Sequence, residues 1–518
     1  MAKIELNEKF KEALALLENT PKNVFITGKA GTGKSTFLEH FRSVTKKNIV
    51  VLAPTGVAAL NVRGETIHSF FRFKPDITIG KVKKIRGRKA DIFRELDAVV
   101  IDEVSMVRAD LLDCIDRFLR INGKKRKVPF GGIQMVFIGD LYQLPPVVTG
   151  KEKGIFKNHY DTPYFFSAKV FEEFSMEFIE LEKVYRQKDE KFIHLLNAIR
   201  NNSLADDDLE LLNRRVNADF ARKEAGAYIV HLTSTNRVAA EINAAHLRKL
   251  KGPVCTYTAQ INGDFAERAY PADYKFSLAS GAQVMFLNND AKGRWVNGTL
   301  GEIVQIRKGG SKEEPDTVLV RLADGKVEKV LPFTWEIFHF TWNDFTQSIE
   351  TETAGSFTQY PLRLAWAVTI HKSQGKTFDK IVIDISGGVF ACGQIYVALS
   401  RCRSLGGIVL KKPLKREHIF VDWRIVDFVT KYQYKISEDN ISLEEKIKFI
   451  QEAAKAKIPL KITYLKANDE KTRRIIQPLN AGKMMYAGKS FIGMEAYCRL
   501  RKDKRVFRVD RILEIENV

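Results

Sequence analysis

The chain has 518 residues, of which 45% are hydrophobic and 28% are charged, and its formal net charge is +21. The length allows several domains with a core each, and no apolar run approaches the roughly 20 residues of a membrane span. Five dispersed cysteines without a Cys-x-x-Cys pair argue against a zinc site or a disulfide framework. The N-terminus lacks a signal-peptide core, so we expect a cytoplasmic protein. The positive charge indicates a polyanionic partner or a lysine-rich surface, and by itself leaves both open.

The first strong pattern is a strand that runs into a glycine-rich loop. After an amphipathic helix expected over 5–18, a strand ends in Gly28-x-x-x-x-Gly33-Lys34-Ser35, the spacing of a phosphate-binding loop. Lys34 would reach the β- and γ-phosphates of ATP, and the Ser35 hydroxyl would bind Mg²⁺. A plain glycine-rich turn is the alternative, which the flanking strand and helix disfavour. The residues expected to bind the nucleotide here are Gly28, Ala30, Gly31, Thr32, Gly33, Lys34, Ser35 and Thr36.

Three more apolar strands follow, each ending in polar residues. The strand over 49–53 leads into Pro54-Thr55-Gly56, that over 98–101 into Asp102-Glu103, and that over 134–138 into Gly139-Asp140. Apolar strands that alternate with helices predict a parallel, doubly wound α/β sheet, with a nucleotide-binding domain over 1–150. A basic run is either a solvated loop or a nucleic-acid contact, with the solvated loop as the default. It comprises Lys81, Lys83, Lys84, Arg86, Arg88 and Lys89.

Polar side chains at the strand ends suggest the chemistry. Asp102 would belong to the Mg²⁺ shell, and Glu103 would polarise the water that attacks the γ-phosphate. An acidic pair at a helix N-terminus is the alternative, which the phosphate loop makes weaker. Gln143 could hydrogen-bond the γ-phosphate or its water, or it could be an ordinary polar group in a turn. Hydrolysis also needs cations, for which Arg186 and Arg401 are candidates, although each alone would be an ordinary surface arginine.

The remaining pattern divides the chain into further parts. A second α/β domain is expected over 151–254 and 361–436, interrupted by a barrel-like β insertion over 255–360. A helical connector is expected over 437–457, and a β-rich module over 458–518. That module carries 14 Lys/Arg against 7 Asp/Glu, and basic charge with interleaved aromatics suits single-stranded nucleic acid. Its tyrosines and phenylalanine could instead form its core.

The ordered motifs together resemble superfamily-one helicases of the B branch, most closely the Pif-type (petite integration frequency) helicases. The resemblance covers about residues 6–430. It rests on the phosphate loop, Ala53–Ala59, Thr66–Phe71, Asp102–Met106, the helix over 110–120, Gly139–Pro146, Tyr185–Gln187, Thr369–Thr377 and Tyr396–Arg403. The module over 458–518 resembles a different family, the WYL domain, through Ile462–Tyr464, Arg473–Pro478, Ala496–Arg501 and Arg505–Ile512, with Thr463 in place of the naming tryptophan.

The resemblance implies two RecA-like domains with ATP and Mg²⁺ between them. It makes Arg186 and Arg401 arginine fingers, adds Gly375 and Lys376 to the nucleotide site, and places a strand-separating wedge at about 72–95. Phe70, Phe71 and Trp295 could stack on bases or belong to the core. A glutamine that reads adenine in the family is missing near Asn7, which could replace it. The residues expected near the nucleic acid are Pro54, Thr55, Gly56, His68, Phe70, Thr235, Asn236, Thr369, His371, Lys372, Tyr464, Arg499 and Arg501.

The leading hypothesis is an ATP-driven DNA helicase that moves 5′ to 3′, a direction that comes wholly from the resemblance. Expected partners are single-stranded DNA and DNA forks or quadruplexes, with no membrane, and we expect a monomer. The family's roles in repair, recombination and telomere maintenance are implied in the same way. A RecD-type recombination helicase and a nucleotide-gated sensor that never unwinds DNA remain as alternatives.

Overall fold

The computed structural model describes residues 7–87, 90–148, 156, 158–217, 228–310, 314–486 and 488–518. The chain divides into two compact units, of which one comprises Met1–Ile199 with Ala205–Phe420 and the other comprises Arg200–Leu204 with Val421–Val518. Among the described helices, none is both long and apolar enough to cross a bilayer.

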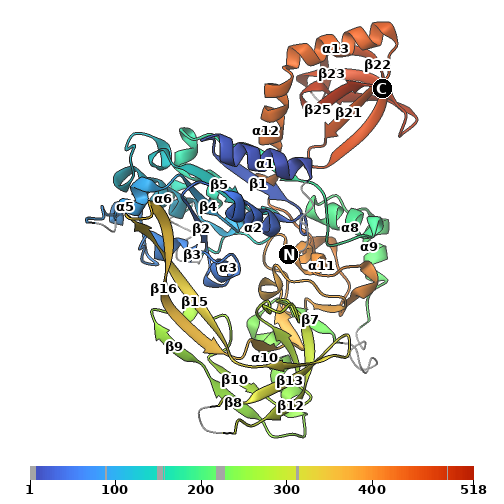
Figure 1. Ribbon diagram of the computed structural model, residues 1–518. Coiled ribbons are helices and arrows are strands. Elements are labelled where there is room, and N and C mark those ends of the chain that lie inside the picture. The colour runs from blue at the N-terminus through green and yellow to red at the C-terminus, as the bar shows by residue number, and fades with distance from the viewer. Residues whose placement is uncertain are drawn as a thin grey trace. The chain divides into compact units, whose positions relative to one another are not determined.

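The first unit begins with a six-stranded parallel sheet in the order β3-β2-β4-β5-β1-β6 (Figure 1). The strands are β1 (Val24–Gly28), β2 (Ile49–Ala53), β3 (Glu65–Thr66), β4 (Ala98–Ile101), β5 (Gln134–Ile138) and β6 (Glu177–Leu181). The helices are α1 (Glu8–Asn19), α2 (Lys34–Val44), α3 (Gly56–Asn61), α4 (Ile67–Phe70), α5 (Asp91–Glu95) and α6 (Ala109–Asn122). Every residue of β1, β4 and β5 is buried, as expected for continuous apolar strands in a parallel sheet.

The first domain extends further along the chain than the predicted boundary at residue 150. Strand β6 pairs in parallel with β1 over its whole length, from Val24 opposite Glu177 to Gly28 opposite Leu181. Ile179 and Leu181 of β6 belong to the same hydrophobic core as Phe10 of α1. The pairing explains the difference, because a strand belongs to the sheet that satisfies its backbone hydrogen bonds.

The second α/β domain contains a four-stranded parallel sheet in the order β18-β7-β19-β20. Its strands are β7 (Val230–Thr233), β18 (Ala367–Thr369), β19 (Ile381–Asp384) and β20 (Ile408–Leu410). The helices are α8 (Glu190–Arg200), α9 (Asp206–Asn213), α10 (Asn236–Arg248) and α11 (Gln394–Ser400). The parallel pairing agrees with the predicted fold class, in which the second α/β domain resumes after an inserted β-rich segment.

The inserted segment forms antiparallel sheets in the orders β14-β13-β12-β11-β17, β10-β8 and β15-β16-β9. Its strands are β8 (Cys255–Thr258), β9 (Gln260–Gly263), β10 (Lys275–Leu278), β11 (Gln283–Phe286), β12 (Leu300–Arg307), β13 (Thr317–Leu322), β14 (Val327–Val330), β15 (Phe333–Asn343), β16 (Ser348–Gln359) and β17 (Leu362–Leu364). Strand β17 pairs with β11, so the insertion continues to residue 364 rather than 360.

The long ribbon of β15 and β16 reaches from the insertion to the first domain, beside α5 (Figure 1). Glu65, a buried residue of β3, accepts hydrogen bonds from Phe340 N at 3.2 Å and pairs with His339 Nδ1 at 2.8 Å. The Phe340 ring also contacts the Phe70 ring edge-on, at 6.1 Å between centroids. The ribbon therefore ties the insertion to the first domain through one buried carboxylate and an aromatic contact.

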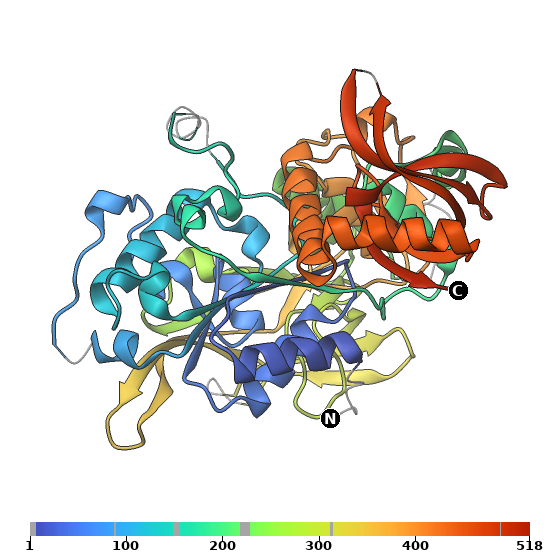
Figure 2. The same cartoon turned by 90° about the horizontal axis from the view of Figure 1, so that it is seen from above.

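The second unit is an antiparallel five-stranded sheet with two helices, in the strand order β24-β23-β22-β21-β25. Its elements are α12 (Trp423–Asn440), α13 (Leu443–Ala456), β21 (Leu460–Leu465), β22 (Lys471–Tyr486), β23 (Lys489–Cys498), β24 (Asp503–Arg508) and β25 (Ile512–Asn517). Helix α13 lies along the sheet in Figure 2, and its Ile450 packs with Ile462 and Met494 in one core. The expected connector over 437–457 is thus helical as predicted, but it belongs to the core of this unit.

Candidate functional site

A cavity of about 870 Å³ opens over the phosphate loop within the first unit, and both α/β domains contribute to its walls. The lining residues of the first domain are Ala30, Gly31, Thr32, Gly33, Lys34, Ser35, Thr36, Glu103 and Gln143. Those that follow β6 are Tyr185, Arg186, Lys188, Asp189, Gly375, Thr377, Arg401, Arg403 and Ser404. Most of the predicted nucleotide and catalytic residues therefore meet in one place.

The loop backbone requires glycine where it turns toward the second domain. Gly31 has φ +82°, and a Cβ atom there would lie 2.6 Å from Arg186 Cβ. Lys34 Nζ donates to the carbonyl oxygens of Gly28 at 2.6 Å and Lys29 at 3.1 Å. These bonds fold the lysine back over its own loop, where its ammonium group also faces the acidic pair. Gly28 is not among the residues that line the cavity, and its carbonyl oxygen accepts the hydrogen bond from Lys34.

Asp102 is buried at the end of β4 and Glu103 beside it is half-buried, and loss of solvent raises both carboxyl pKa values. The pKa of Asp102 rises to about 6, and that of Glu103 rises to about 7, where repulsion from Asp102 adds to the burial. A base that titrates near neutral pH suits proton transfer from water. Glu103 also lies at φ +51°, a strained backbone position for a non-glycine residue that is common at functional sites.

Gln374 connects this acidic pair to the other strand-end motif, and the sequence analysis did not single it out. Its Nε2 donates to Glu103 Oε2 at 3.3 Å and to Gln143 Oε1 at 3.1 Å. Gln143 Nε2 in turn donates to Asp140 Oδ2 at 3.1 Å. A chain of side-chain hydrogen bonds therefore runs from the second domain through both predicted catalytic residues of the first.

Lys376 differs from its prediction as a nucleotide ligand. Its Nζ donates to Asn297 Oδ1 of the inserted segment at 2.5 Å, and it is not among the residues that line the cavity. Burial lowers its pKa to about 7. Gly375 lines the cavity as predicted, and Thr377 takes the place expected for Lys376. The motif was visible in the sequence, whereas the direction of each side chain depends on the turn after β18.

The two arginines expected as fingers lie together at the cavity wall. Arg186 Nη1 donates to the Ser400 carbonyl at 3.2 Å, and Arg401 donates to Val397 O at 3.0 Å and Ser400 Oγ at 2.8 Å. Burial and the charge of Arg186 lower the pKa of Arg401 to about 9. A buried Arg401 beside a half-buried Arg186 is an arrangement that favours an anionic ligand between the domains.

The expected metal ligands are Ser35, a hydroxyl in the first turn of α2, and Asp102, a carboxylate directly after β4. Oxygen donors are the ligands that Mg²⁺ prefers, and this ion usually keeps several waters and binds substrate phosphates. In the described part of the chain, no cluster of three or more His, Cys, Asp or Glu side chains could hold a metal alone. A partial protein shell of this kind fits a magnesium ion that arrives with the nucleotide.

Three threonines expected near nucleic acid share one structural role. Thr55, Thr235 and Thr369 follow or end parallel strands, and each side-chain oxygen accepts a backbone N–H three residues later, at 3.2 to 3.4 Å. Pro54, Gly56, Asn236, His371 and Lys372 lie in the same turns. His68 follows β3, and burial with the charges of Arg268 and Arg108 lowers its pKa. The carboxyl ends of the strands thus gather these predicted residues at the edges of two sheets.

The aromatic residues predicted as possible base contacts are core residues. Phe70, Phe71 and Trp295 expose 5%, 1% and 5% of their surfaces. The two phenylalanine rings lie among other aromatic rings of the first domain, and Trp295 stacks on Phe286 at 4.4 Å. Phe70 is therefore corrected from a nucleic-acid contact to a packing residue. Of the basic run, Lys81, Lys83, Lys84 and Arg86 are exposed, while Arg88 and Lys89 lie outside the described residues.

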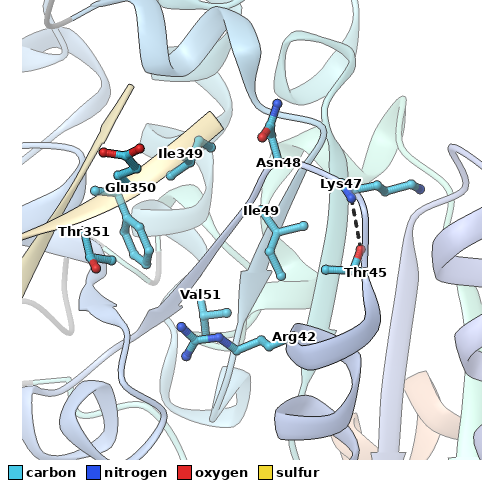
Figure 3. Close-up of a pocket in the computed structure, with 10 residues that line it drawn as sticks. Arg42, Thr45, Lys47, Asn48, Ile49, Val51, Ile349, Glu350 and Thr351 are labelled. Carbon is cyan, nitrogen blue, oxygen red and sulfur yellow. Dashed lines mark hydrogen bonds between the residues drawn. The ribbon is translucent and has the colours of Figure 1, made fainter. Parts of the chain in front are cut away.

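A second cavity, of about 520 Å³, lies between β2 and β16 (Figure 3). Its two cations are already engaged by the protein, because Arg42 donates to the Arg63 carbonyl at 3.1 Å and Lys47 donates to Gln134 Oε1 at 2.9 Å. Figure 3 shows the Lys47 side chain turned away from Ile49. None of the predicted site residues lines this cavity, so it does not compete with the cavity over the phosphate loop.

In the C-terminal unit, the predicted contact residues differ in exposure. Arg499 and Arg501 are exposed at the turn after β23, whereas Tyr464 is half-buried with its ring edge-on to Phe507 at 5.3 Å. Tyr497 is 40% exposed, and Phe507 belongs to the core. Phe507 is therefore a core residue, and Tyr497 is exposed.

Comparison with known proteins agrees with this geometry. Residues 5–209 match the PIF1-like helicase family, and residues 445–517 match the WYL domain. The ATP-dependent DNA helicase Pif1 of Bdellovibrio bacteriovorus is 32% identical over 442 residues, which are 83% of this chain and 93% of that protein. The structure of Bacteroides Pif1 with ADP-AlF4 has a TM-score of 0.76 at 37% identity, covering 84% of this chain and 98% of that one. The same Bacteroides protein bound to single-stranded DNA has a TM-score of 0.61 at 37% identity, with the same coverage. The chain belongs to the PIF1-like helicase family and carries a WYL domain over its last residues.

Proposed function

We propose that this protein is an ATP-driven helicase that moves 5′ to 3′ along single-stranded DNA. The observation that carries the proposal is the 870 Å³ cavity, where a phosphate loop and Glu103 face two arginines across two α/β domains. The structural likeness to Bacteroides Pif1 in complex with ADP-AlF4 supports nucleotide binding there. The direction of movement rests on family membership alone.

In the proposed reaction, Glu103 accepts a proton from the water that attacks the γ-phosphate. Gln374 and Gln143 hold that carboxylate and its water in place through the hydrogen bonds described above. Arg186 and Arg401 stabilise the negative charge that develops on the phosphoryl oxygens. Ser35 and Asp102 would hold Mg²⁺, which supplies further positive charge when bound. Hydrolysis would remove the anion that both domains grip, so that the cavity can open and the DNA advance.

Strand displacement with tailed duplexes tests the motor. The parent protein should unwind a duplex with a 5′ single-stranded tail in the presence of ATP and Mg²⁺, and a 3′ tail should not support unwinding. Lys34→Ala should abolish unwinding because the phosphates lose their cation. ATPase activity without unwinding of either tail would favour a nucleotide-gated sensor, and unwinding from the 3′ tail would refute the proposed polarity.

The preferred DNA and the oligomeric state belong to the same proposal. One solved Bacteroides structure concerns the unwinding of forked double-stranded DNA by two coordinating Pif1 helicases. We propose forks and quadruplexes as substrates of a monomer in free solution. Unwinding rates on forks, quadruplexes and tailed duplexes at several protein concentrations test this, since a rate that rises with the square of the concentration would indicate paired motors.

We further propose that the WYL domain adds affinity for single-stranded DNA. Support comes from its 14 Lys/Arg against 7 Asp/Glu over 458–518 and from the exposed Arg499 and Arg501. Arg499→Glu with Arg501→Glu should weaken binding to oligo(dT) and flatten its salt dependence, because fewer counterions are released. An unchanged salt slope would assign the domain to a protein or a small ligand. Charge reversal is preferable to deletion, since Arg200–Leu204 and α12 belong to the same unit.

A further inference from the structure

Phe390 is an exposed aromatic residue beside the predicted DNA contacts, and the site described above does not account for it. Phe390 is 61% exposed and lies in the loop between β19 and α11. Its ring is parallel to that of His371, with 6.1 Å between centroids and 10° between planes. Burial lowers the pKa of His371, which keeps the imidazole neutral and suitable for stacking. The exposed ring therefore extends a stack that begins at a predicted DNA contact.

The loop that carries Phe390 is held in place at both ends. Gln394 is buried. Its Oε1 accepts hydrogen bonds from the backbone N–H groups of Phe390 at 3.1 Å and Ala391 at 3.4 Å. At the start of the loop, a Cβ atom on Gly387 would lie 2.7 Å from Ser234 Oγ, directly before Thr235. An exposed ring that is backed by a parallel ring presents a flat face on which a nucleic-acid base can stack.

Positive charge lies next to this stack. Lys372 follows His371 directly, and burial together with the charge of Arg363 lowers its pKa, while Asp273 raises it. Arg363 Nη2 donates to Pro271 O at 3.4 Å and lies 4.0 Å from Asp273 Oδ1, whereas its buried Nε has no hydrogen-bond partner in the described part of the chain. Aromatic faces with nearby cations are the features by which proteins bind single strands, through bases and phosphates respectively.

The same loop also touches the ATP site. Gly393 has φ +72°, and a Cβ atom there would lie 2.2 Å from Tyr142 O and 2.7 Å from Gln143 O. Helix α11 begins at the next residue. The hydroxyl group of its Tyr396 accepts a hydrogen bond from the backbone N–H of Ala30, in the phosphate loop, at 2.9 Å. The segment from Phe390 to Arg401 thus extends from the exposed ring to the cavity wall.

We propose that Phe390, backed by His371, is a stacking platform for one base of single-stranded DNA, and that its loop links this platform to the ATP cavity. The inference rests on the proposed function and adds to it a specific base contact. Because every base has a π face, the platform would grip DNA without regard to sequence. Lys372 and Arg363 would hold the phosphate of the same strand.

Binding of oligo(dT) and of an abasic oligomer of equal length tests the platform. Phe390→Ala should weaken oligo(dT) binding about tenfold, the scale of one lost base stack, and should affect the abasic oligomer far less. The salt slope should stay unchanged, because no counterion is involved, whereas Lys372→Ala should reduce it by about one. Phe390→Trp should restore the affinity and Phe390→Leu should not. DNA stimulation of ATPase should need more DNA in Phe390→Ala.

Phe345→Ala provides the matched control, since Phe345 is 96% exposed at the ribbon tip, where Asp344, Glu350 and Glu352 disfavour DNA. This variant should bind oligo(dT) like the parent. Parent-like affinity of Phe390→Ala, or equal losses for both oligomers, would overturn the inference while leaving the proposed helicase intact. If the parent itself neither binds oligo(dT) nor unwinds tailed duplexes, the proposed function fails first.

Discussion

Replacing Gln374 with methionine should slow ATP turnover, because this amide holds two catalytic side chains at once. The bond to the Glu103 carboxylate is of the kind worth about 1.5–3 kcal/mol, and the bond to Gln143 about 0.5–1.5 kcal/mol. Both bonds are long and the two losses overlap, so we expect about 2 kcal/mol at the transition state. That value corresponds to roughly a 30-fold lower kcat at saturating DNA.

The pH profile distinguishes this role from a general loss of structure. The pKa of Glu103 is already raised to about 7, and removing a donor to its ionised form raises it further. The acid limb of kcat should therefore move to higher pH in Gln374→Met. Gln374→Glu keeps the size of the side chain but places a hydrogen-bond acceptor against Glu103, so it should shift the acid limb to still higher pH. Steady-state ATPase assays from pH 5.5 to 9 measure both effects. The reasoning would be refuted if kcat of Gln374→Met stayed within twofold of the parent value and the acid limb of its pH profile did not shift.

Three further predictions concern other residues. Glu103→Gln should retain ATP binding in a fluorescent-nucleotide assay while single-turnover hydrolysis stops, and parent-like hydrolysis would show that another group is the base. Asp469→Asn removes the carboxylate that lies 3.6 Å from the buried Arg200 guanidinium. Denaturant unfolding should show a loss of about 3 kcal/mol, which Arg200→Met in the same chain should largely restore if charge is the cause. The hydrogen bond with Glu65 raises the pKa of His339 above its ordinary value of 6.5. The contact therefore stabilises the ribbon fully at a pH below 6.5, and this stabilisation is lost as the pH rises through the raised pKa. Hydrogen exchange over 337–353, corrected for intrinsic rates, should increase from pH 6 to 8 in the parent but change little in His339→Gln.

Features that depend on local spacing could be predicted from the amino-acid sequence alone. The phosphate loop from Gly28 to Ser35 needs glycines and a lysine at fixed intervals, and those intervals specify the backbone that surrounds a phosphate. The acidic pair after β4 was predictable in the same way, because an apolar run sets where a buried strand ends. The parallel sheets followed from the alternation of such runs with helices, and both arginines that the family resemblance singled out line the cavity over the phosphate loop.

Which side chains are exposed, and where they point, depends on the folded domains. Phe70 and Phe390 are both phenylalanines next to recognised motifs, yet one is packed among core rings and the other is exposed on a fixed loop. Gln374 and Lys376 lie two residues apart, and the turn after β18 directs the first to the acidic pair and the second to Asn297. Exposure and direction depend on contacts between segments hundreds of residues apart. Local patterns specify backbone conformation, but the burial that selects among equivalent side chains comes from the assembled domains.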